Sequence, residues 1–165
     1  MQNTKNPLIF IVNDSVVYKD LLVGFLTSKG FNNLKTFNSG EEALKSIHLK
    51  PDIVVLDYSF DGITGLELMH KVQEDHPETE FIFLSGQNDV EVAVNIMRRG
   101  AGDYIVKNEK APENLLHSIE YFISATKKEK IKKGFQIGVV GFFIMMFLLI
   151  MIIILLTIFL EDFDM

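Results

Sequence analysis

The sequence has 165 residues, is 48% hydrophobic and carries a formal net charge of −6, with an isoelectric point near 5.2. This length allows one ordinary domain with a real hydrophobic core. The acidic balance argues against nucleic acid as the main partner, because no basic domain is available to face the phosphates. The chain has no cysteine, which excludes disulfides, thiolate metal sites and cysteine nucleophiles.

Five short apolar runs predict strands, and they alternate with amphipathic stretches that predict helices. The runs are Leu8–Val12, Leu34–Phe37, Ile53–Asp57, Phe81–Ser85 and Tyr104–Val106. Strands that alternate with helices predict an α/β fold in which a parallel sheet is covered on both faces. Sheets of this kind bind ligands outside the carboxyl ends of their strands.

Polar residues and glycine mark the predicted helix ends. Three pairs have the spacing of a capping box, with a glutamate three residues after the N-cap: Ser39 with Glu42, Thr64 with Glu67, and Asn88 with Glu91. Gly100 predicts the end of the helix that Asn88 starts. Pro112 suits the first turn of a last helix. The inward face of that helix is predicted to consist of Leu115, Ile119, Phe122 and Ile123.

The sequence from Gly134 to Leu160 contains no charged residue. At about 1.5 Å per residue, a helix over residues 135–160 would be about 39 Å long, which exceeds the hydrocarbon core of about 30 Å. A buried core helix is the alternative, but such helices seldom exceed about 20 residues without a polar face. We therefore predict a transmembrane helix over residues 135–160.

The flanks of the apolar segment predict its orientation. The lysine-rich residues 127–134 precede it and the acidic residues 161–165, EDFDM, follow it. Under the positive-inside rule the lysine side is cytoplasmic. We expect a single-pass protein of the cytoplasmic membrane, with residues 1–126 on the cytoplasmic side, a basic juxtamembrane segment and a short acidic tail. The polar start, MQNTKNP, predicts no cleaved secretory peptide.

Polar residues stand at the ends of four predicted strands: Asn13 and Asp14, then Asp57, then Ser85 and Gly86, then Lys107. Taken singly, an aspartate in such a place is usually a turn or cap residue. Because the carboxyl ends of parallel strands meet at one edge, the set together assembles carboxylates, a hydroxyl and an ammonium group. Mg²⁺ prefers one or two carboxylates with water and phosphate oxygens, and aspartate can accept a phosphoryl group. A lysine and a hydroxyl can stabilise the transferring oxygens.

Four segments, IFIVND, DIVVLDYSFDGITGLEL, FIFLSG and GAGDYIVK, stand in an order and spacing that resembles the receiver domain of bacterial two-component response regulators. The resemblance extends from about Leu8 to Ala125. It implies a doubly wound, flavodoxin-like sheet of five parallel strands in the order 2-1-3-4-5. It also implies a phosphoacceptor signalling domain that is not an enzyme, whose partner is a sensor histidine kinase or a phosphotransfer protein.

The resemblance implies that Asp57 is the phosphoacceptor. It further implies that Asp14 and Asp57 bind Mg²⁺ directly, together with the backbone carbonyl of Ser59. Asn13 stands where the family usually has an acid that contacts the metal mostly through water. We therefore expect Asn13 to be a weak outer-shell ligand, and the site to bind Mg²⁺ less tightly without losing it.

The resemblance also places the residues that would contact the phosphoryl group. Ser85 and Lys107 take the positions of the family's hydroxyl and lysine, and Gly86 leaves access for a phosphodonor. Tyr104 matches the switch aromatic, which is coupled to the hydroxyl on activation, although an ordinary strand aromatic is an equal alternative. Asn108 follows Lys107 where the family has a proline, usually in a cis peptide. Since a non-proline cis bond costs about 2.5–4 kcal/mol, either the loop holds that strain or the loop differs.

A third departure lies in the turn after Asp57, where YSFDG replaces the family's Met-Pro-Gly type of turn. Asp61 and Gly62 have good turn chemistry, so Asp61 is interpreted as structural. The alternative is that its extra charge slows anionic phosphodonors.

The combined expectation is a membrane-anchored receiver that signals through protein docking, with no DNA-binding output domain. The resemblance implies an output face formed by residues 89–99, 104–106 and 112–125, to which an unknown downstream protein would bind. The alternative is a pseudo-receiver, a membrane-tethered scaffold that works without phosphorylation. Asn13 and Asn108 favour this alternative, whereas the retained aspartates, hydroxyl and lysine favour the first.

Overall fold

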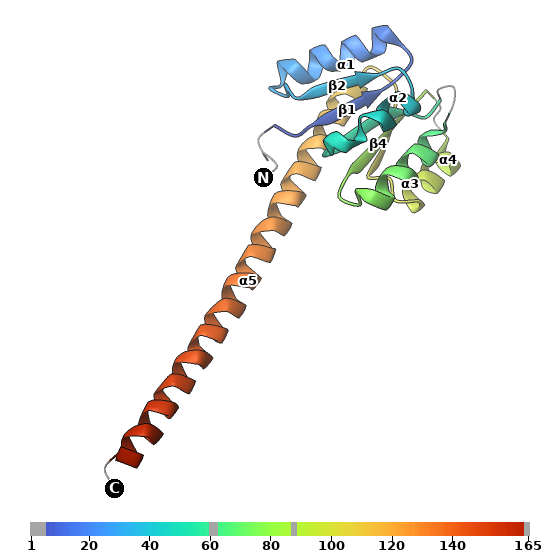
Figure 1. Ribbon diagram of the computed structural model, residues 1–165. Coiled ribbons are helices and arrows are strands. Elements are labelled where there is room, and N and C mark those ends of the chain that lie inside the picture. The colour runs from blue at the N-terminus through green and yellow to red at the C-terminus, as the bar shows by residue number, and fades with distance from the viewer. Residues whose placement is uncertain (1–5, 60–62, 87–88, 164–165) are drawn as a thin grey trace. The chain divides into compact units, whose positions relative to one another are not determined.

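The computed structural model describes residues 6–59, 63–86 and 89–163. Contacts within the chain divide it into two units, Met1–Ile123 and Ser124–Met165. The first unit contains all the strands and the first four helices, and the second belongs to the last helix (Figure 1). The predicted Asp61–Gly62 turn, the predicted cap Asn88 and the last two residues of the acidic tail lie outside the described residues.

The sheet of the first unit has five parallel strands in the order β2-β1-β3-β4-β5. This order confirms the flavodoxin-like topology. The strands are β1 (Ile9–Val12), β2 (Leu34–Phe37), β3 (Ile53–Asp57), β4 (Glu80–Ser85) and β5 (Asp103–Val106). The predicted bounds of β2 and β3 are correct, and those of the other three strands differ by one residue at the first position.

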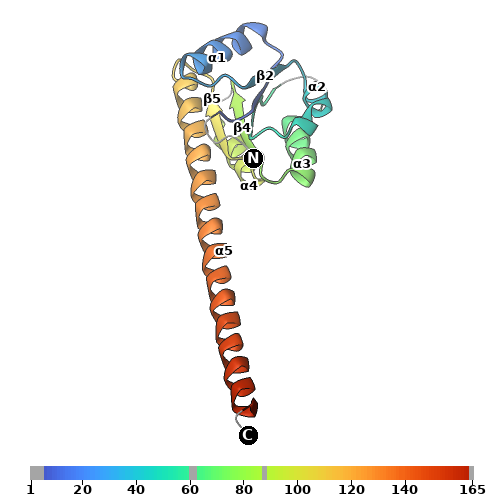
Figure 2. The ribbon, with the colours of Figure 1, turned by 60° about the vertical axis from the view of Figure 1, so that its left-hand side comes forward.

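Helices connect the strands and cover both faces of the sheet (Figure 2). They are α1 (Val16–Ser28), α2 (Gly40–Lys45), the short 3-10 helix η1 (Ile47–Leu49), α3 (Gly65–Asp75), α4 (Val90–Arg98) and α5 (Ala111–Phe163). Helix α1 and the first turns of α5 pack on one face of the sheet, and α2, α3 and α4 pack on the other. This is the covered parallel sheet that the alternation of strands and helices predicts.

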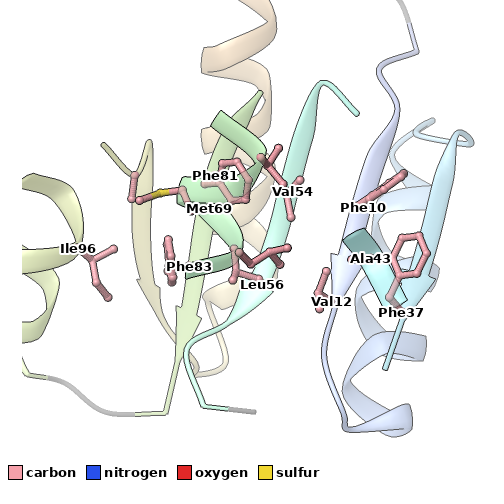
Figure 3. Packing of buried hydrophobic residues seen from close by; sticks show 13 residues of the cluster. Phe10, Val12, Phe37, Ala43, Val54, Leu56, Met69, Phe81, Phe83 and Ile96 are labelled. Carbon is pink, nitrogen blue, oxygen red and sulfur yellow. The ribbon is translucent and has the colours of Figure 1, made fainter. Parts of the chain in front are cut away.

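Successive strand residues point to opposite faces of the sheet, so each face has its own core. Phe10, Val54 and Phe83 belong to the core under α2, α3 and α4 (Figure 3). The core under α1 and α5 includes Leu115 and Ile119, which are fully buried, with Phe122 and Ile123 at its margin. The predicted inward face of the last helix is therefore confirmed.

The helix caps largely follow the predicted pairs. Ser39 caps α2 by accepting a hydrogen bond from the backbone N–H of Glu42, at 3.3 Å. The carboxylate of Glu42 accepts instead from the N–H of Asn38, at 2.7 Å. Thr64 and Glu67 form a full capping box at the start of α3, and the N–H and hydroxyl of Thr64 lower the pKa of Glu67.

The predicted cap of α4 is wrong. Asp89, not Asn88, is the N-cap, and its carboxylate accepts hydrogen bonds from the N–H groups of Glu91 and Val92. Aspartate and asparagine are about equally good caps, so only the backbone course selects between two adjacent candidates. The predicted stop is confirmed, because Gly100 follows α4 with a φ of 100°, which glycine adopts without strain.

Gly65 brings the start of α3 close to the end of β3. A side chain at this position would place its Cβ 2.6 Å from Leu56 Cδ1 and 2.9 Å from Phe83 Cε1. Both neighbours are buried in the core. The absence of a side chain at Gly65 therefore lets the helix begin directly beside the strand that carries Asp57.

The second unit is helical, because α5 continues without a break from Ala111 to Phe163. Phe135–Ile153 is long and apolar enough to cross a membrane, judged by length and composition. Its large apolar side chains are exposed, from 37% at Val139 to 74% at Ile137. An exposed apolar surface of this length is the opposite of a soluble core helix, which buries its apolar residues.

Candidate functional site

Asp57 ends β3, a central strand of the sheet, and is only 4% exposed. Strand β4 runs beside it, with Asp57 opposite Leu84. The ladder continues one residue further, where the N–H of Tyr58 donates to the carbonyl of Leu84 at 2.7 Å. Because β3 lies between β1 and β4, the Asp57 carboxylate is buried at the carboxyl edge of the sheet.

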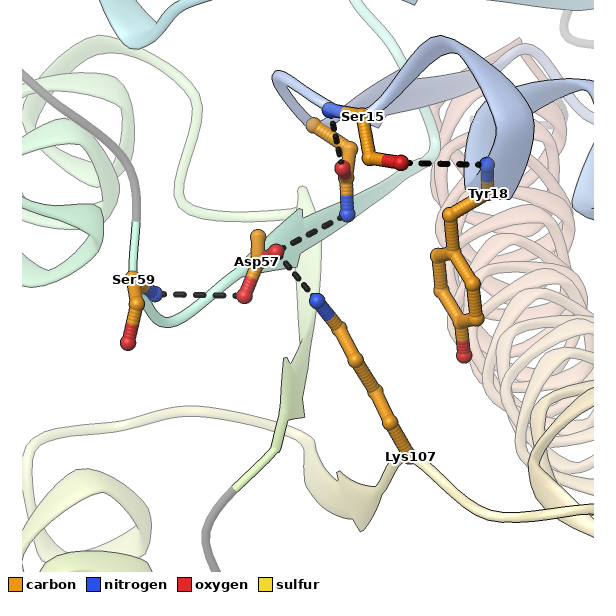
Figure 4. Close-up of polar contacts among 6 residues, drawn as sticks. Ser15, Tyr18, Asp57, Ser59 and Lys107 are labelled. Atoms are coloured by element: carbon orange, nitrogen blue, oxygen red, sulfur yellow. Dashed lines mark hydrogen bonds and ion pairs between the residues drawn. The ribbon is translucent and has the colours of Figure 1, made fainter.

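Three donors converge on the Asp57 carboxylate (Figure 4). The side-chain amide of Asn13 donates to Oδ2 at 3.0 Å. Lys107 Nζ forms an ion pair with the same oxygen. The backbone N–H of Ser59 donates to Oδ1 at 3.2 Å. A buried charge is costly unless it is paired and hydrogen-bonded, and these donors provide both.

The orientation of the Asn13 amide is set by its second hydrogen bond. Asn13 is fully buried, and its Oδ1 accepts from the backbone N–H of Ser15 at 2.8 Å. With the oxygen engaged there, the NH₂ group faces Asp57. In this orientation Asn13 presents a donor to Asp57, and its expected role as an outer-shell ligand, which acts through water, stays a prediction.

Lys107 reaches Asp57 from the end of β5. Its backbone N–H donates to the carbonyl of Ser85 at 2.7 Å, which continues the β4–β5 ladder. The described residues contain no cis peptide bond. Asn108 instead accepts a hydrogen bond from the N–H of Lys110 at 2.9 Å through its side chain. Of the two alternatives for this loop, the structure therefore shows a different loop, an Asx turn that leads into α5.

Tyr18 is a site residue that the sequence reasoning missed. It lies in the first turn of α1, and its ring centroid is 4.9 Å from Lys107 Nζ. Burial of the side chain, and then the negative charge of Asp57, raise the pKa of Tyr18. The only signal in the sequence is its spacing, one helical turn after Asp14, at the start of a helix that leaves the site edge.

The remaining predicted residues lie at the same edge with different exposure. Ser85 is fully buried at the end of β4, whereas Asp14 and Gly86 are exposed. A Cβ atom at Gly86 would meet nothing within 4 Å, which agrees with open access on that side. Tyr104 is half-buried and packs against the core under α2, α3 and α4. Asn13, Ser59 and Lys107 thus contact Asp57, and the carboxylate of Asp14 lies at the surface.

The donor set of this edge suits Mg²⁺. Among the described residues no group of three histidine, cysteine or acidic side chains has metal-binding geometry. Mg²⁺ does not need such a group, because it is usually bound by one or two carboxylates with water and substrate oxygens. Asp57 and Asp14, with the carbonyl of Ser59, supply oxygens of this kind. A cation would have to compete with Asn13 and Lys107 for the oxygens of Asp57.

The fold and the site together define a class of protein: a doubly wound α/β domain with a buried aspartate at the end of β3 and a lysine at the end of β5 that pairs with it. Residues 9–120 match the response regulator receiver domain. The chain belongs to this family. Receiver domains are signalling domains of two-component systems.

Individual relatives agree with this assignment. The chain is 32% identical to the transcriptional regulatory protein YesN of Bacillus subtilis over 130 residues, which cover 76% of this chain and 34% of YesN. It is 30% identical to the luminescence regulatory protein LuxO of Vibrio campbellii over 98 residues, which cover 59% of this chain and 21% of LuxO. The matched region is therefore about a third or less of these curated relatives.

Solved structures show the same fold. The receiver domain of NtrX from Brucella abortus is 33% identical with a TM-score of 0.64, and the match covers 70% of this chain and 98% of that one. The beryllofluoride-activated DrrB receiver domain is 29% identical with a TM-score of 0.65, covering 72% and 98%. Both matches include nearly the whole of the other receiver domain.

Proposed function

We propose that this chain is a membrane-held phosphoacceptor, which takes a phosphoryl group on Asp57 from a histidine kinase or a phosphotransfer protein. The observation that carries the proposal is the convergence of Lys107 Nζ on the buried carboxylate of Asp57. A solvated strand-end aspartate needs no such cation. A phosphoacceptor does, because the transferring oxygens carry negative charge that an ammonium group stabilises.

The proposed transfer follows from the residues around Asp57. A carboxylate oxygen attacks the phosphorus of a phosphohistidine, the P–N bond breaks, and an acyl phosphate forms while the histidine nitrogen keeps the bonding electron pair and takes up a proton. Lys107 exchanges its partner from the carboxylate to a phosphoryl oxygen. Ser85, at the end of the next strand, would donate its hydroxyl to another phosphoryl oxygen. The exposed side at Gly86 admits the donor.

Mg²⁺ is the expected cofactor of this transfer. Asp14 and Asp57 would hold it with the carbonyl of Ser59, and the bound ion would supply positive charge to the phosphoryl oxygens. The exposure of Asp14 leaves its carboxylate accessible for this purpose.

The second candidate is a pseudo-receiver that binds partners without being phosphorylated. One observation favours it: Asn13, Lys107 and Ser59 already satisfy both oxygens of Asp57, so the carboxylate needs no metal ion to be paired. In such a protein the site would be a structural cluster at the edge of the sheet. Either form would present α4, β5 and the first part of α5 to an unknown downstream protein.

Membrane attachment rests on the apolar, exposed segment Phe135–Ile153. At about 1.5 Å per residue, nineteen residues cover about 28 Å, close to the hydrocarbon core of about 30 Å. The lysines of residues 127–134 favour a cytoplasmic location for the receiver domain. Confinement to a surface would raise its effective concentration near membrane kinases.

The deciding experiment treats the full chain in detergent micelles with acetyl phosphate and Mg²⁺. We expect intact-protein mass spectrometry to show the mass gain of one phosphoryl group, and we expect Asp57→Asn to remove it. Wild-type protein that is phosphorylated neither by small donors nor by histidine kinases, and that binds no beryllofluoride, would leave the pseudo-receiver as the function.

The orientation of the chain in the membrane is tested separately. In sealed inner-membrane vesicles whose cytoplasmic face is outside, added protease should degrade the receiver domain. Protection of residues 1–126 under these conditions would contradict the cytoplasmic orientation and, with it, access to a cytoplasmic kinase.

A further inference from the structure

Tyr18 lies beside the site without belonging to the predicted set of site residues. Lys107 Nζ stands 4.9 Å from the centroid of its ring, within the range of about 6 Å in which a cation and an aromatic face attract each other. Figure 4 shows the ring alongside the lysine side chain, on the side away from Ser59. The ammonium group therefore has two neighbours, the Asp57 carboxylate and an aromatic ring.

The ring gives the Lys107 side chain a second contact beside its ion pair with Asp57. The Lys107 side chain is 23% exposed, whereas that of Asp57 is 6% exposed. A lysine side chain has about 2 kcal/mol of rotamer entropy, so an ammonium group at a partly open site spends time away from its partner unless something holds it. The Tyr18 ring lies against this ammonium group, and the attraction between a cation and an aromatic face opposes its departure.

The hydroxyl of Tyr18 does not explain why the residue is there. Its oxygen is buried and has no hydrogen-bond partner among residues 6–59, 63–86 and 89–163. A buried, unpaired hydroxyl is a cost to stability. The contribution of this side chain to the site is therefore its ring, which also packs at the margin of the core under α1 and α5.

We propose that Tyr18 is a positioning residue, whose ring holds the Lys107 ammonium group at the phosphoacceptor carboxylate. Its consequence for phosphoryl transfer rests on the proposed function, but the contact itself does not. With the ring present, Lys107 is in place when the phosphoryl group arrives. Without it, the ion pair with Asp57 alone holds the ammonium group, Lys107 is in place for less of the time, and the transfer slows.

Three variants separate this role from simple packing. Tyr18→Leu removes the ring, and Tyr18→Phe keeps the ring and removes the hydroxyl. Phe25→Leu is the matched control, because Phe25 is another aromatic residue of α1 at the margin of the same core. The ring of Phe25 faces Lys29, at 5.5 Å from its Nζ, instead of Lys107. All variants are made in the full chain and studied in detergent micelles.

The first readout needs no phosphorylation. In NMR spectra of lysine-labelled protein, the side-chain signals of Lys107 should show an upfield ring-current shift in the wild type and in Tyr18→Phe. Tyr18→Leu should lose the shift, and Phe25→Leu should keep it. The signal is assigned by its disappearance in Lys107→Arg. The absence of a ring-current shift in the wild type would overturn the proposal, whether or not Asp57 is phosphorylated.

The second readout is a double-mutant cycle on the phosphorylation rate with acetyl phosphate. We expect Tyr18→Leu to slow the maximal rate by about threefold to thirtyfold, the range that a cation–π contact gives, while Tyr18→Phe restores most of it. In a Lys107→Ala background the same change should have no further effect. An equal slowing with and without Lys107, or in Phe25→Leu, would show that Tyr18 acts only through packing.

Discussion

Folded proteins usually bury apolar side chains and expose polar ones. The carboxyl edge of the sheet and the segment Phe135–Ile153 depart from this pattern in opposite ways. At the edge, three polar side chains are buried, because Asn13, Asp57 and Ser85 are at most 4% exposed. In Phe135–Ile153, large apolar side chains are exposed along the whole helix segment. Each arrangement costs free energy in water, one by desolvating polar groups and the other by exposing apolar surface.

The difference lies in what offsets the cost. The described residues themselves offset the cost at the edge, since Asn13, Lys107 and Ser59 satisfy the charge of Asp57. Nothing comparable covers the side chains of residues 135–153, which are exposed throughout. The Asp57 carboxylate is paired within the chain, whereas the described residues leave the apolar segment uncovered. This difference is the physical argument behind the two proposals, chemistry at the edge and membrane contact along the apolar segment.

The largest expected effect tests the proposal that the exposed apolar segment enters a membrane. Phe147→Arg together with Met151→Arg would place two charges near the middle of the uncharged sequence Gly134–Leu160. At about 2.5–3.5 kcal/mol for each charge, insertion should become about 5–7 kcal/mol less favourable. Fractionation after alkaline extraction should find the double variant in the soluble or aggregated fraction and the wild type in the membrane pellet. The control replaces both residues by leucine. Equal membrane retention of the arginine variant would contradict the assigned span.

The next largest effect tests whether Lys107 offsets the cost of burying the Asp57 carboxylate. Lys107→Met removes the cation and leaves the buried Asp57 carboxylate with its neutral donors only. An unsatisfied buried acceptor costs about 1–3 kcal/mol, so the free energy of unfolding of the receiver domain should fall by about this amount. Urea unfolding at neutral pH measures it. The matched control is Lys110→Met, because Lys110 is exposed in the same loop. A loss no larger than that of the control would mean that the ion pair contributes nothing to stability.

Local sequence patterns predict most of the fold. The bounds of β2 and β3 are correct to the residue, because apolar runs bounded by polar residues leave little choice. The order of the strands came from the resemblance to receiver domains and not from the runs themselves. The start of α4 was assigned to Asn88, one residue before the true cap, Asp89. Both residue types cap equally well, and the choice depends on a backbone course that no local pattern fixes.

The candidate site is only partly predictable for a similar reason. Asp57 and Lys107 were expected from the resemblance, and the structure pairs them. The role of Asn13 depends on which way its amide points. That orientation is set by the backbone N–H of Ser15, at the start of α1, which donates to Asn13 Oδ1. The contact of Tyr18 with Lys107 joins the first turn of one helix to the end of a distant strand. Such contacts follow from the packed structure; the spacing of Tyr18 one helical turn after Asp14 places it near the edge but does not indicate Lys107 as its neighbour.

A smaller effect sharpens the account of the site. Asn13→Asp replaces the donor that faces Asp57 with a second carboxylate. Like charges at one site disfavour each other, so the metal-free protein should lose about 1–2 kcal/mol of stability. Mg²⁺ should then bind about tenfold more tightly, which is about 1.4 kcal/mol of extra stabilisation at saturation. Thermal unfolding with and without Mg²⁺ measures both effects.

The control for this change is Asn33→Asp, which adds the same charge at an exposed loop position before β2. It should alter neither the metal-free stability nor the response to Mg²⁺. If Asn13→Asp binds Mg²⁺ no more tightly than the wild type, position 13 does not influence the cation, and its amide serves only to orient Asp57.

The smallest effect concerns the hydroxyl of Tyr18, which is the one cost at the edge that the described residues do not offset. Tyr18→Phe removes this unpaired hydroxyl and keeps the ring at Lys107, so stability should be unchanged or rise by up to about 1 kcal/mol.

Tyr18→Phe also changes how stability responds to alkaline pH. Because folding raises the pKa of Tyr18 above its usual value of 10.0, the unfolded chain loses this proton first as the pH rises. Stability is therefore full below pH 10 and falls as the pH approaches the higher folded-state pKa. Urea unfolding of both proteins at neutral pH and above pH 10 should show the difference between them widening in favour of Tyr18→Phe. A difference that stays constant across this range would mean that the hydroxyl titrates alike in the folded and unfolded chain, and that its surroundings are as polar as water.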